Sequence, residues 1–123
     1  MNGVHPALVA VMERAIEITD VDFGVISGVR TRDEQKEHVK SKASSTMNSR
    51  HIPENNRCRM SCAVDVLAYR KNGKHTYAWD YYERIAKAVF KAAIPMGVDV
   101  EWGGFWWSPS DGMHFQLSWD SYP

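Results

Sequence analysis

The segment from Cys62 to Tyr69, CAVDVLAY, combines the alternation of a β-strand with a carboxylate at its centre. An Asn-Gly pair at positions 72–73 follows it, which is a strong signal for a hairpin turn. Asp65 lies between Val64 and Val66, whose side chains must point to the opposite face of the strand. Because a buried carboxylate is costly unless it is paired or bound to a metal, the fold must bring a partner to Asp65.

Helical and strand-like segments alternate along the rest of the chain. Helical features mark three segments: His5–Thr19, Thr31 to about Val39, and a longer helix that Asp80 and Glu83 open and that Pro95 and Gly97 end. Further strands are expected at Phe23–Ser27, Val98–Trp102 and His114–Trp119. Because hairpin-like connections dominate, we predict an α+β fold, in which a small antiparallel sheet packs with about three helices.

Length and charge narrow the class of protein further. The 123 residues fit a single domain, which we expect to span residues 1–123. Net charge is zero and the basic residues are scattered, so we expect no binding of nucleic acid or of an anionic membrane surface. No apolar run approaches the length of a membrane span, and the first residues lack the features of a signal peptide. We therefore expect folding in a cytoplasm, with Cys58 and Cys62 as thiols.

The histidines fall into two groups. His5, His38 and His75 occupy a helix start, a charged helix and a hairpin turn, where a solvated side chain is the simplest expectation. His51 lies in a long polar loop over residues 40–59, and a loop of this length in a compact domain is more often functional than idle. His114 starts a strand, and the turn before it places Asp111 three residues upstream.

The residues alone leave two readings of these polar groups open. Asp65 and the two histidines His51 and His114 could share a metal ion, because His and Asp side chains are common ligands. Asp65 could equally accept a salt bridge from Arg30, and His114 could be an interior histidine with its hydrogen bonds satisfied. The spacing in the sequence does not decide between them.

Four short segments, SGVRTRDEQ, SRH…AVDV, VEWGG and DGMHFQL, occur in an order that resembles the M15 family of zinc peptidases. Within that family the chain is most similar to the phage endolysins that act as L-alanyl-D-glutamate peptidases, which are related to the D-Ala-D-Ala carboxypeptidases. The segments run from Ser27 to Leu117 and so cover most of the chain.

The resemblance implies a set of functional residues. Its three metal ligands correspond to His51, Asp65 and His114, which would hold one Zn²⁺ per chain. Asp111 corresponds to the catalytic base, and Arg30 to the active-site arginine that helps to stabilise the developing oxyanion.

Ser49 and Gln35 also match family positions, with roles in placing the substrate. A cluster of tryptophans, Trp102, Trp106, Trp107 and Trp119, surrounds the last motif. We expect these tryptophans mainly in the core and at its rim. The alternative is that Trp106 or Trp107 forms a wall of a substrate groove.

The sequence departs from the family pattern at three places. His51 and Asp65 are fourteen positions apart, whereas the family has the shorter run H-x-x-G-x-A-x-D, so residues 52–64 contain an insertion. Phe105 follows Gly-Gly where the family has aspartate, and Met113 replaces the proline before the last histidine. We expect the insertion to stay at the surface beside the cleft, either as a passive loop or with Arg57 and Arg59 facing substrate carboxylates.

The resemblance implies a zinc endopeptidase that cleaves the L-Ala–D-Glu bond of bacterial peptidoglycan. It also implies a monomeric endolysin kept in the host cytoplasm until a holin permeabilises the membrane, without insertion of the enzyme itself. A D-Ala-D-Ala carboxypeptidase or dipeptidase of the same family, and an inactive wall-binding module, are the alternatives. A structural zinc site on Cys58 and Cys62 is a further alternative, for which a fourth ligand is missing.

Overall fold

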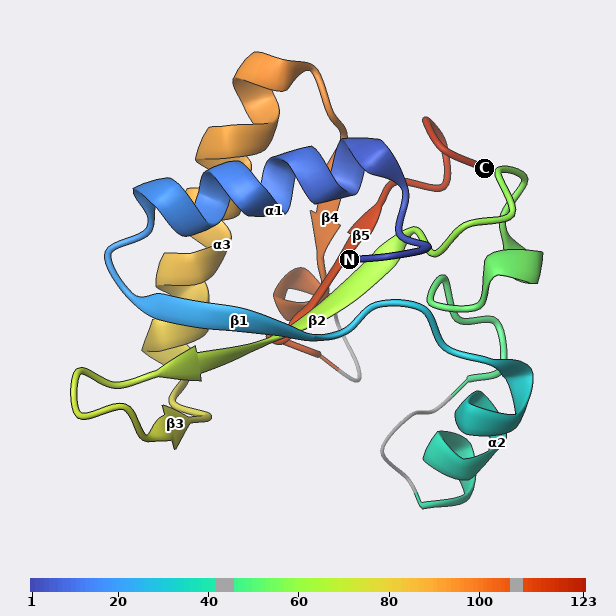
Figure 1. The fold of residues 1–123 in the computed structure, drawn as a ribbon, viewed down its shortest axis with the longest axis horizontal. Coiled ribbons are helices and arrows are strands. Elements are labelled where there is room, and N and C mark those ends of the chain that lie inside the picture. Colours follow the sequence, from blue (N-terminus) through green and yellow to red (C-terminus); the bar gives the residue numbers. More distant parts are fainter. Residues whose placement is uncertain (42–45, 107–109) are drawn as a thin grey trace.

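The structure is a computed structural model, which describes residues 1–41, 46–106 and 110–123. The described α-helices are α1 (Pro6–Ile18), α2 (Arg32–Lys40) and α3 (Trp79–Met96). Two 3₁₀ turns, η1 (Pro53–Asn55) and η2 (Gly103–Phe105), are described as well. The described strands are β1 (Asp22–Ser27), β2 (Ala63–Tyr69), β3 (His75–Thr76), β4 (Val100–Trp102) and β5 (His114–Leu117). Figure 1 shows their arrangement.

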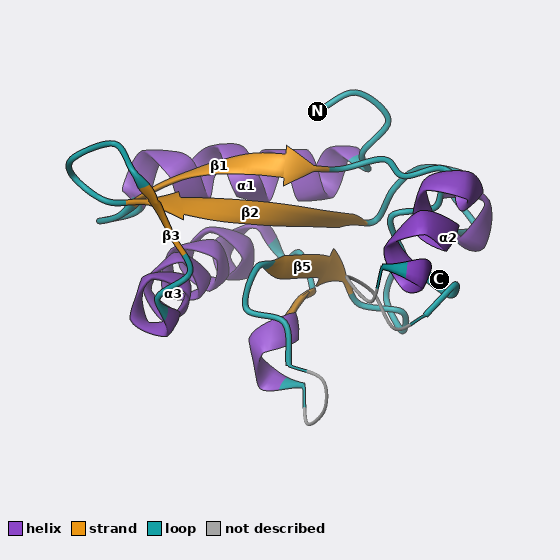
Figure 2. Ribbon diagram, turned by 90° about the horizontal axis from the view of Figure 1, so that it is seen from below, coloured by secondary structure: helices purple, strands orange, loops and turns teal. Residues whose placement is uncertain are grey.

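The strands form one antiparallel sheet, in which β2 is central. Its order is β1-β2-β5-β4, and β3 pairs with β2 as a short hairpin. In the view of Figure 2, α1 lies behind β1 and β2, and α2 lies at the opposite end of these strands from β3. The predicted α+β fold is thus confirmed.

One face of the sheet is apolar and packs against α1 and α3. The cross-strand pairs Val64–Phe115 and Phe115–Trp102 show that these side chains share a face. They belong to one buried cluster with residues of both helices. The helical members are Leu8, Val11, Met12 and Ala15 of α1, and Tyr82, Ile85, Ala86, Ala88, Val89, Ala92 and Ala93 of α3. The opposite face of the same strands is therefore left for polar side chains.

The starts of α1 and α2 match the sequence pattern, and the start of α3 differs from it. The Thr31–Glu34 capping box forms, with both of its hydrogen bonds at 3.1 Å. The expected opening of the longest helix by Asp80 and Glu83 is wrong, since α3 begins at Trp79 and its N-cap Ala78 makes no side-chain bond. Asp80 instead lies in the first turn, where its negative charge interacts favourably with the positive end of the helix dipole.

The end of α3 also differs slightly from the prediction. The helix continues through Pro95 to Met96, because a proline in an exposed last turn removes only one backbone hydrogen bond. Gly97 then ends the helix with a φ of 69°, a left-handed conformation that glycine adopts without steric cost.

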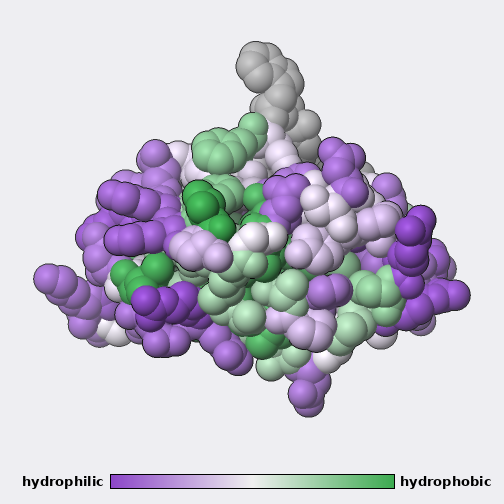
Figure 3. Space-filling view, turned by 90° about the horizontal axis from the view of Figure 1, so that it is seen from above, coloured by the Kyte–Doolittle hydropathy of each residue, from purple (hydrophilic) through white to green (hydrophobic). Residues whose placement is uncertain are grey.

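The surface is that of an ordinary globular domain. In the view from above, hydrophobic surface gathers near the centre of the face and hydrophilic side chains surround it (Figure 3). Among the described residues, no helix is both long and apolar enough to cross a bilayer.

The inserted segment is built into the fold around Asn56. The Asn56 side chain is buried, accepts a hydrogen bond from Arg50 Nε at 2.9 Å, and donates to the carbonyls of Arg50 and Met60 at 3.0 and 2.8 Å. Ile52 is fully buried too. The expectation that the whole segment lies at the surface is therefore wrong, because Asn56 is buried to supply one of the acceptors that the buried guanidinium of Arg50 requires.

Arg50 in turn joins the insertion to the C-terminal residues. Its guanidinium donates to the carbonyls of Leu117, at 2.6 Å, and of Tyr122, and it lies 3.9 Å from the ring centre of Trp119. Since His51 follows Arg50 in the chain, this network fixes the loop that carries His51.

Candidate metal centre

Asp65 and His114 lie opposite each other on neighbouring strands, on the polar face of the sheet. They are a register pair of β2 and β5, so their side chains point to the same side. The partner required by Asp65 is therefore supplied partly by the sheet itself.

His51 reaches Asp65 from the loop that precedes the insertion. The Ser49 hydroxyl accepts a hydrogen bond from the His51 N–H at 3.2 Å, and the His51 carbonyl accepts one from the Arg30 N–H at 2.9 Å. The ring nitrogen Nδ1 lies 2.7 Å from the Gly28 carbonyl oxygen. These contacts fix both the backbone and the ring of His51.

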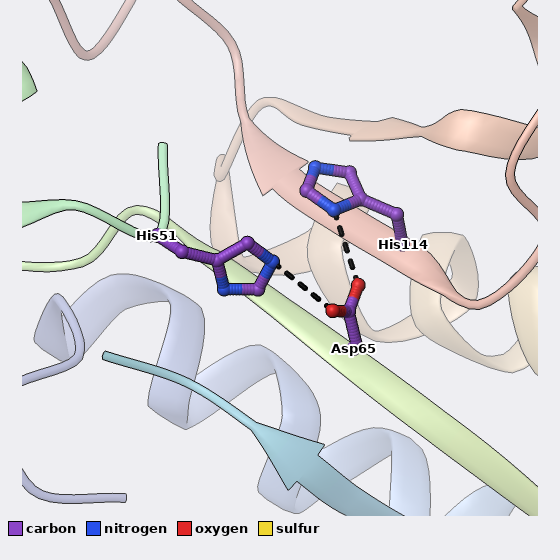
Figure 4. Close-up of side chains that lie close together, drawn as sticks. All are labelled: His51, Asp65 and His114. Atoms are coloured by element: carbon purple, nitrogen blue, oxygen red, sulfur yellow. Dashed lines mark hydrogen bonds and ion pairs between the residues drawn. The ribbon is translucent and has the colours of Figure 1, made fainter. Parts of the chain in front are cut away.

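Both imidazole rings point toward the carboxylate of Asp65, each toward a different oxygen (Figure 4). His51 Nε2 lies 3.3 Å from Asp65 Oδ2, and His114 Nδ1 lies 3.2 Å from Asp65 Oδ1. One potential ligand atom from each residue falls within 4.8 Å of the others. In the part of the chain that the structure describes, His51 Nε2 is the buried side-chain polar atom without a hydrogen-bond partner.

This geometry fits a metal ion with nitrogen and oxygen ligands. Tetrahedral zinc, bound at about 2.0–2.1 Å, holds its ligand atoms about 3.3 Å apart. Because the Gly28 carbonyl can only accept, His51 Nδ1 donates to it, and Nε2 is the ring nitrogen that a metal ion beside Asp65 would bind in place of a proton. A buried ring nitrogen that can offer its lone pair beside a carboxylate is the arrangement that a metal ligand requires.

Charges in the site favour an ionised Asp65. Burial alone would raise the pKa of this carboxyl, but hydrogen bonds and charges from His114 and His51 hold the pKa well below its usual range. Burial would lower the pKa of His114, and the contact with Asp65 raises it above its ordinary value. A bound cation would take the place of the proton between them.

Arg30 is held against the site by several contacts. One guanidinium nitrogen donates to Asp65 Oδ2 and to the Ser27 hydroxyl, both at 3.1 Å, and the other donates to Gln35 Oε1 at 2.7 Å. The salt bridge from Arg30 thus coexists with the histidine contacts: Arg30 and His51 both lie at Asp65 Oδ2, and His114 lies at Oδ1. Gln35 is fully buried, and its amide nitrogen donates to the Thr46 carbonyl, so its side chain is not accessible from the cleft.

Asp111 stands at the rim of the same cleft. Its Oδ1 accepts from the Met113 N–H at 3.2 Å, and its own N–H donates to the Gly103 carbonyl at 2.9 Å. A Cβ at Gly103 would collide with the Asp111 carbonyl oxygen, so glycine is needed for this close approach. Partial burial and the charge of Asp65 raise the pKa of the Asp111 carboxyl.

A cleft of about 980 Å³ opens over the cluster. Ser49, Arg30 and Asp111 line it with the three clustered residues, and Trp106 tilts over His114 with 5.1 Å between ring centres. His38, for which a solvated position was expected, is half-buried and lines this cleft because α2 packs beside it.

Of the other tryptophans and arginines considered for the substrate groove, some line the cleft and others do not. Trp102 is buried in the core, Trp119 lines the cleft beside Arg50, and Trp107 lies outside the described residues. Arg57 and Arg59 are exposed but do not belong to the cleft lining that the structure describes. The backbone N–H of Arg57 instead donates to the Pro123 carbonyl, which directs this part of the insertion toward the C-terminus.

The two cysteines contact each other rather than the cluster. Their sulfur atoms are 3.5 Å apart, and burial raises the pKa of the Cys62 thiol to about 12. Within the described residues, the converging group of potential metal ligands does not include them. The structure gives no support to a second metal site in the insertion.

Known protein families and solved structures include matches to this chain. Residues 1–117 match the family described as phage L-alanyl-D-glutamate peptidase. The chain belongs to this family. Among solved structures, it is similar to the L-Ala D-Glu endopeptidase ChiX from Serratia marcescens, with a TM-score of 0.84 and 42% sequence identity. The match covers 97% of this chain and 84% of that chain. Comparison with curated protein sequences gives no match.

Proposed function

We propose that this family member is a zinc-dependent endopeptidase that cleaves the L-Ala–D-Glu bond in the peptide stem of bacterial peptidoglycan. The observation that carries the proposal is the spacing of His51, Asp65 and His114, whose facing atoms lie 3.3 and 3.2 Å apart. With three protein ligands, one zinc per chain would keep an open coordination position, as catalytic zinc sites do.

Zinc, when bound, would lower the pKa of water from about 15.7 to about 7 and polarise the scissile carbonyl. The proton of the attacking water needs an acceptor, and Asp111 at the rim of the cleft supplies a carboxylate for it. The same carboxyl can then pass the proton to the leaving amine of D-glutamate.

Arg30 serves two purposes in this proposal. Its hydrogen bond to Asp65 Oδ2 holds the carboxylate in the orientation that the two histidines share. Because Arg30 is only 6% exposed yet lines the cleft, its positive charge acts over a short, poorly solvated distance on negative charge that develops on the substrate. Gln35 supports Arg30 rather than the substrate, and Ser49 both lines the cleft and orients His51.

Membership of a phage family supports a proposal for the biological setting. We propose that the monomer accumulates in the host cytoplasm and reaches the wall, without inserting into the membrane, once a holin permeabilises that membrane. Clustered ligands together with a base at the cleft favour an enzyme over an inactive wall-binding module, because binding alone requires no proton acceptor.

Mass spectrometry of digested peptidoglycan tests the proposed bond. We expect the purified protein to release peptides that begin with D-glutamate and to leave L-alanine on the glycan strand. A chelator such as EDTA should prevent the release. Loss of only the terminal D-alanine would identify a carboxypeptidase instead, and the absence of any new fragment would contradict an enzymatic role.

A further inference from the structure

We propose that Glu101 and Gln116 form a positioning pair that makes Nδ1 the metal-binding nitrogen of His114. Glu101 on β4 is the register partner of Gln116 on β5. Gln116 lies two residues after His114, so the two side chains share the polar face of the sheet. This inference rests on the proposed zinc site, and it assigns a role to two residues that lie within the segments VEWGG and DGMHFQL but received no role from the resemblance.

The hydrogen bonds run in one direction along this pair. The Gln116 amide nitrogen donates to Glu101 Oε2 at 3.4 Å, and Gln116 Oε1 lies 2.8 Å from His114 Nε2. An ionised carboxylate can only accept, so Glu101 selects the amide orientation in which the oxygen of Gln116 faces the histidine. An amide oxygen also only accepts, so His114 Nε2 must carry a proton and donate it.

The consequence lies on the opposite side of the imidazole ring. With Nε2 protonated and bonded to Gln116, Nδ1 is the nitrogen left to face the ion beside Asp65 Oδ1, 3.2 Å away. Metal-binding histidines generally donate their second ring N–H to such a partner, which fixes the ring and its protonation. His114 and Gln116 are 7% and 6% exposed, so water cannot readily take the place of a lost partner.

The two histidines of the site differ in how the proton is fixed on the ring nitrogen that faces away from the metal. His51 donates to the Gly28 carbonyl, and a backbone carbonyl cannot become a donor. The Gln116 side chain can turn over and present its NH₂ group instead. A fixed acceptor behind it is therefore needed at His114 and not at His51, and Glu101 supplies that acceptor.

The test compares zinc affinity in matched variants. Glu101→Gln keeps the shape of the side chain but can donate as well as accept, so it no longer selects one orientation of Gln116. We expect its zinc dissociation constant to rise about 10-fold, and that of Gln116→Leu about 10–100-fold, as measured by competition with a chromophoric chelator. Glu83→Gln, the same change at an exposed position of α3, should leave the affinity unchanged.

A spectroscopic readout separates this role from simple packing. In the zinc-loaded wild type, ¹⁵N NMR should show a slowly exchanging His114 Nε2–H, and in Gln116→Leu this proton should exchange rapidly. Wild-type affinity in both variants would overturn the inference alone, and weakening in Gln116→Leu only would overturn the role of Glu101. Failure of the wild type to bind zinc would overturn the proposed function, and the inference with it.

Discussion

Replacing Asp65 with asparagine is expected to remove bound zinc and abolish peptidoglycan cleavage. The substitution keeps the shape of the side chain but removes the charge that lies between His51 and His114 and beside Arg30. Partners that merely support metal ligands typically change affinity 10–100-fold, so loss of a charged ligand should weaken zinc binding by more than about 100-fold.

Metal analysis of the purified variant after dialysis measures this effect directly, and near-UV circular dichroism reports whether the fold is retained. Asp22→Asn, an isosteric change at an exposed residue of β1, is the matched control and should bind zinc as the wild type does. One equivalent of zinc retained by Asp65→Asn would exclude Asp65 as a ligand.

Asp111→Asn is expected to separate catalysis from metal binding. The amide oxygen can still accept the hydrogen bond from the Met113 N–H, so the turn and the cleft should persist. The amide cannot take a proton from water at neutral pH, so kcat should fall by about 10²–10⁴-fold while zinc content stays at one equivalent.

Steady-state hydrolysis of a soluble stem peptide, followed by release of the new amino group, gives the required rate. The exposed Asp120→Asn variant controls for the loss of one negative charge near the C-terminus. Turnover of Asp111→Asn within about threefold of the wild type would mean that another group accepts the proton in general-base catalysis.

The strands and helices could be predicted because their apolar periods are regular and their turn signals local. The alternation around Asp65 and the Asn-Gly turn placed β2 and its hairpin correctly, and the Thr31–Glu34 pair placed the start of α2. The start of α3 was missed because the hydrophobic Ala78–Trp79 boundary carries no polar cap for a sequence pattern to detect.

The functional site was only partly visible in the sequence. The structure brings together His51, Asp65 and His114, which the family motifs had indicated. Gln116 lies in the segment DGMHFQL, two residues after His114 on the same strand, but nothing in the sequence indicated its contact with His114. The support of Arg50 could not be predicted, because its acceptors are carbonyl oxygens of residues more than sixty positions away and an amide inside an insertion. Such partners depend on tertiary packing rather than on residue type.

Titration of the metal-free enzyme with zinc is the measurement that tests the central claim most directly. Protein stripped with a chelator should release no peptide beginning with D-glutamate, and added zinc should restore the release linearly up to one equivalent per chain. Full cleavage by protein that contains less than about a tenth of an equivalent of any metal would contradict a metal-dependent peptidase built on His51, Asp65 and His114.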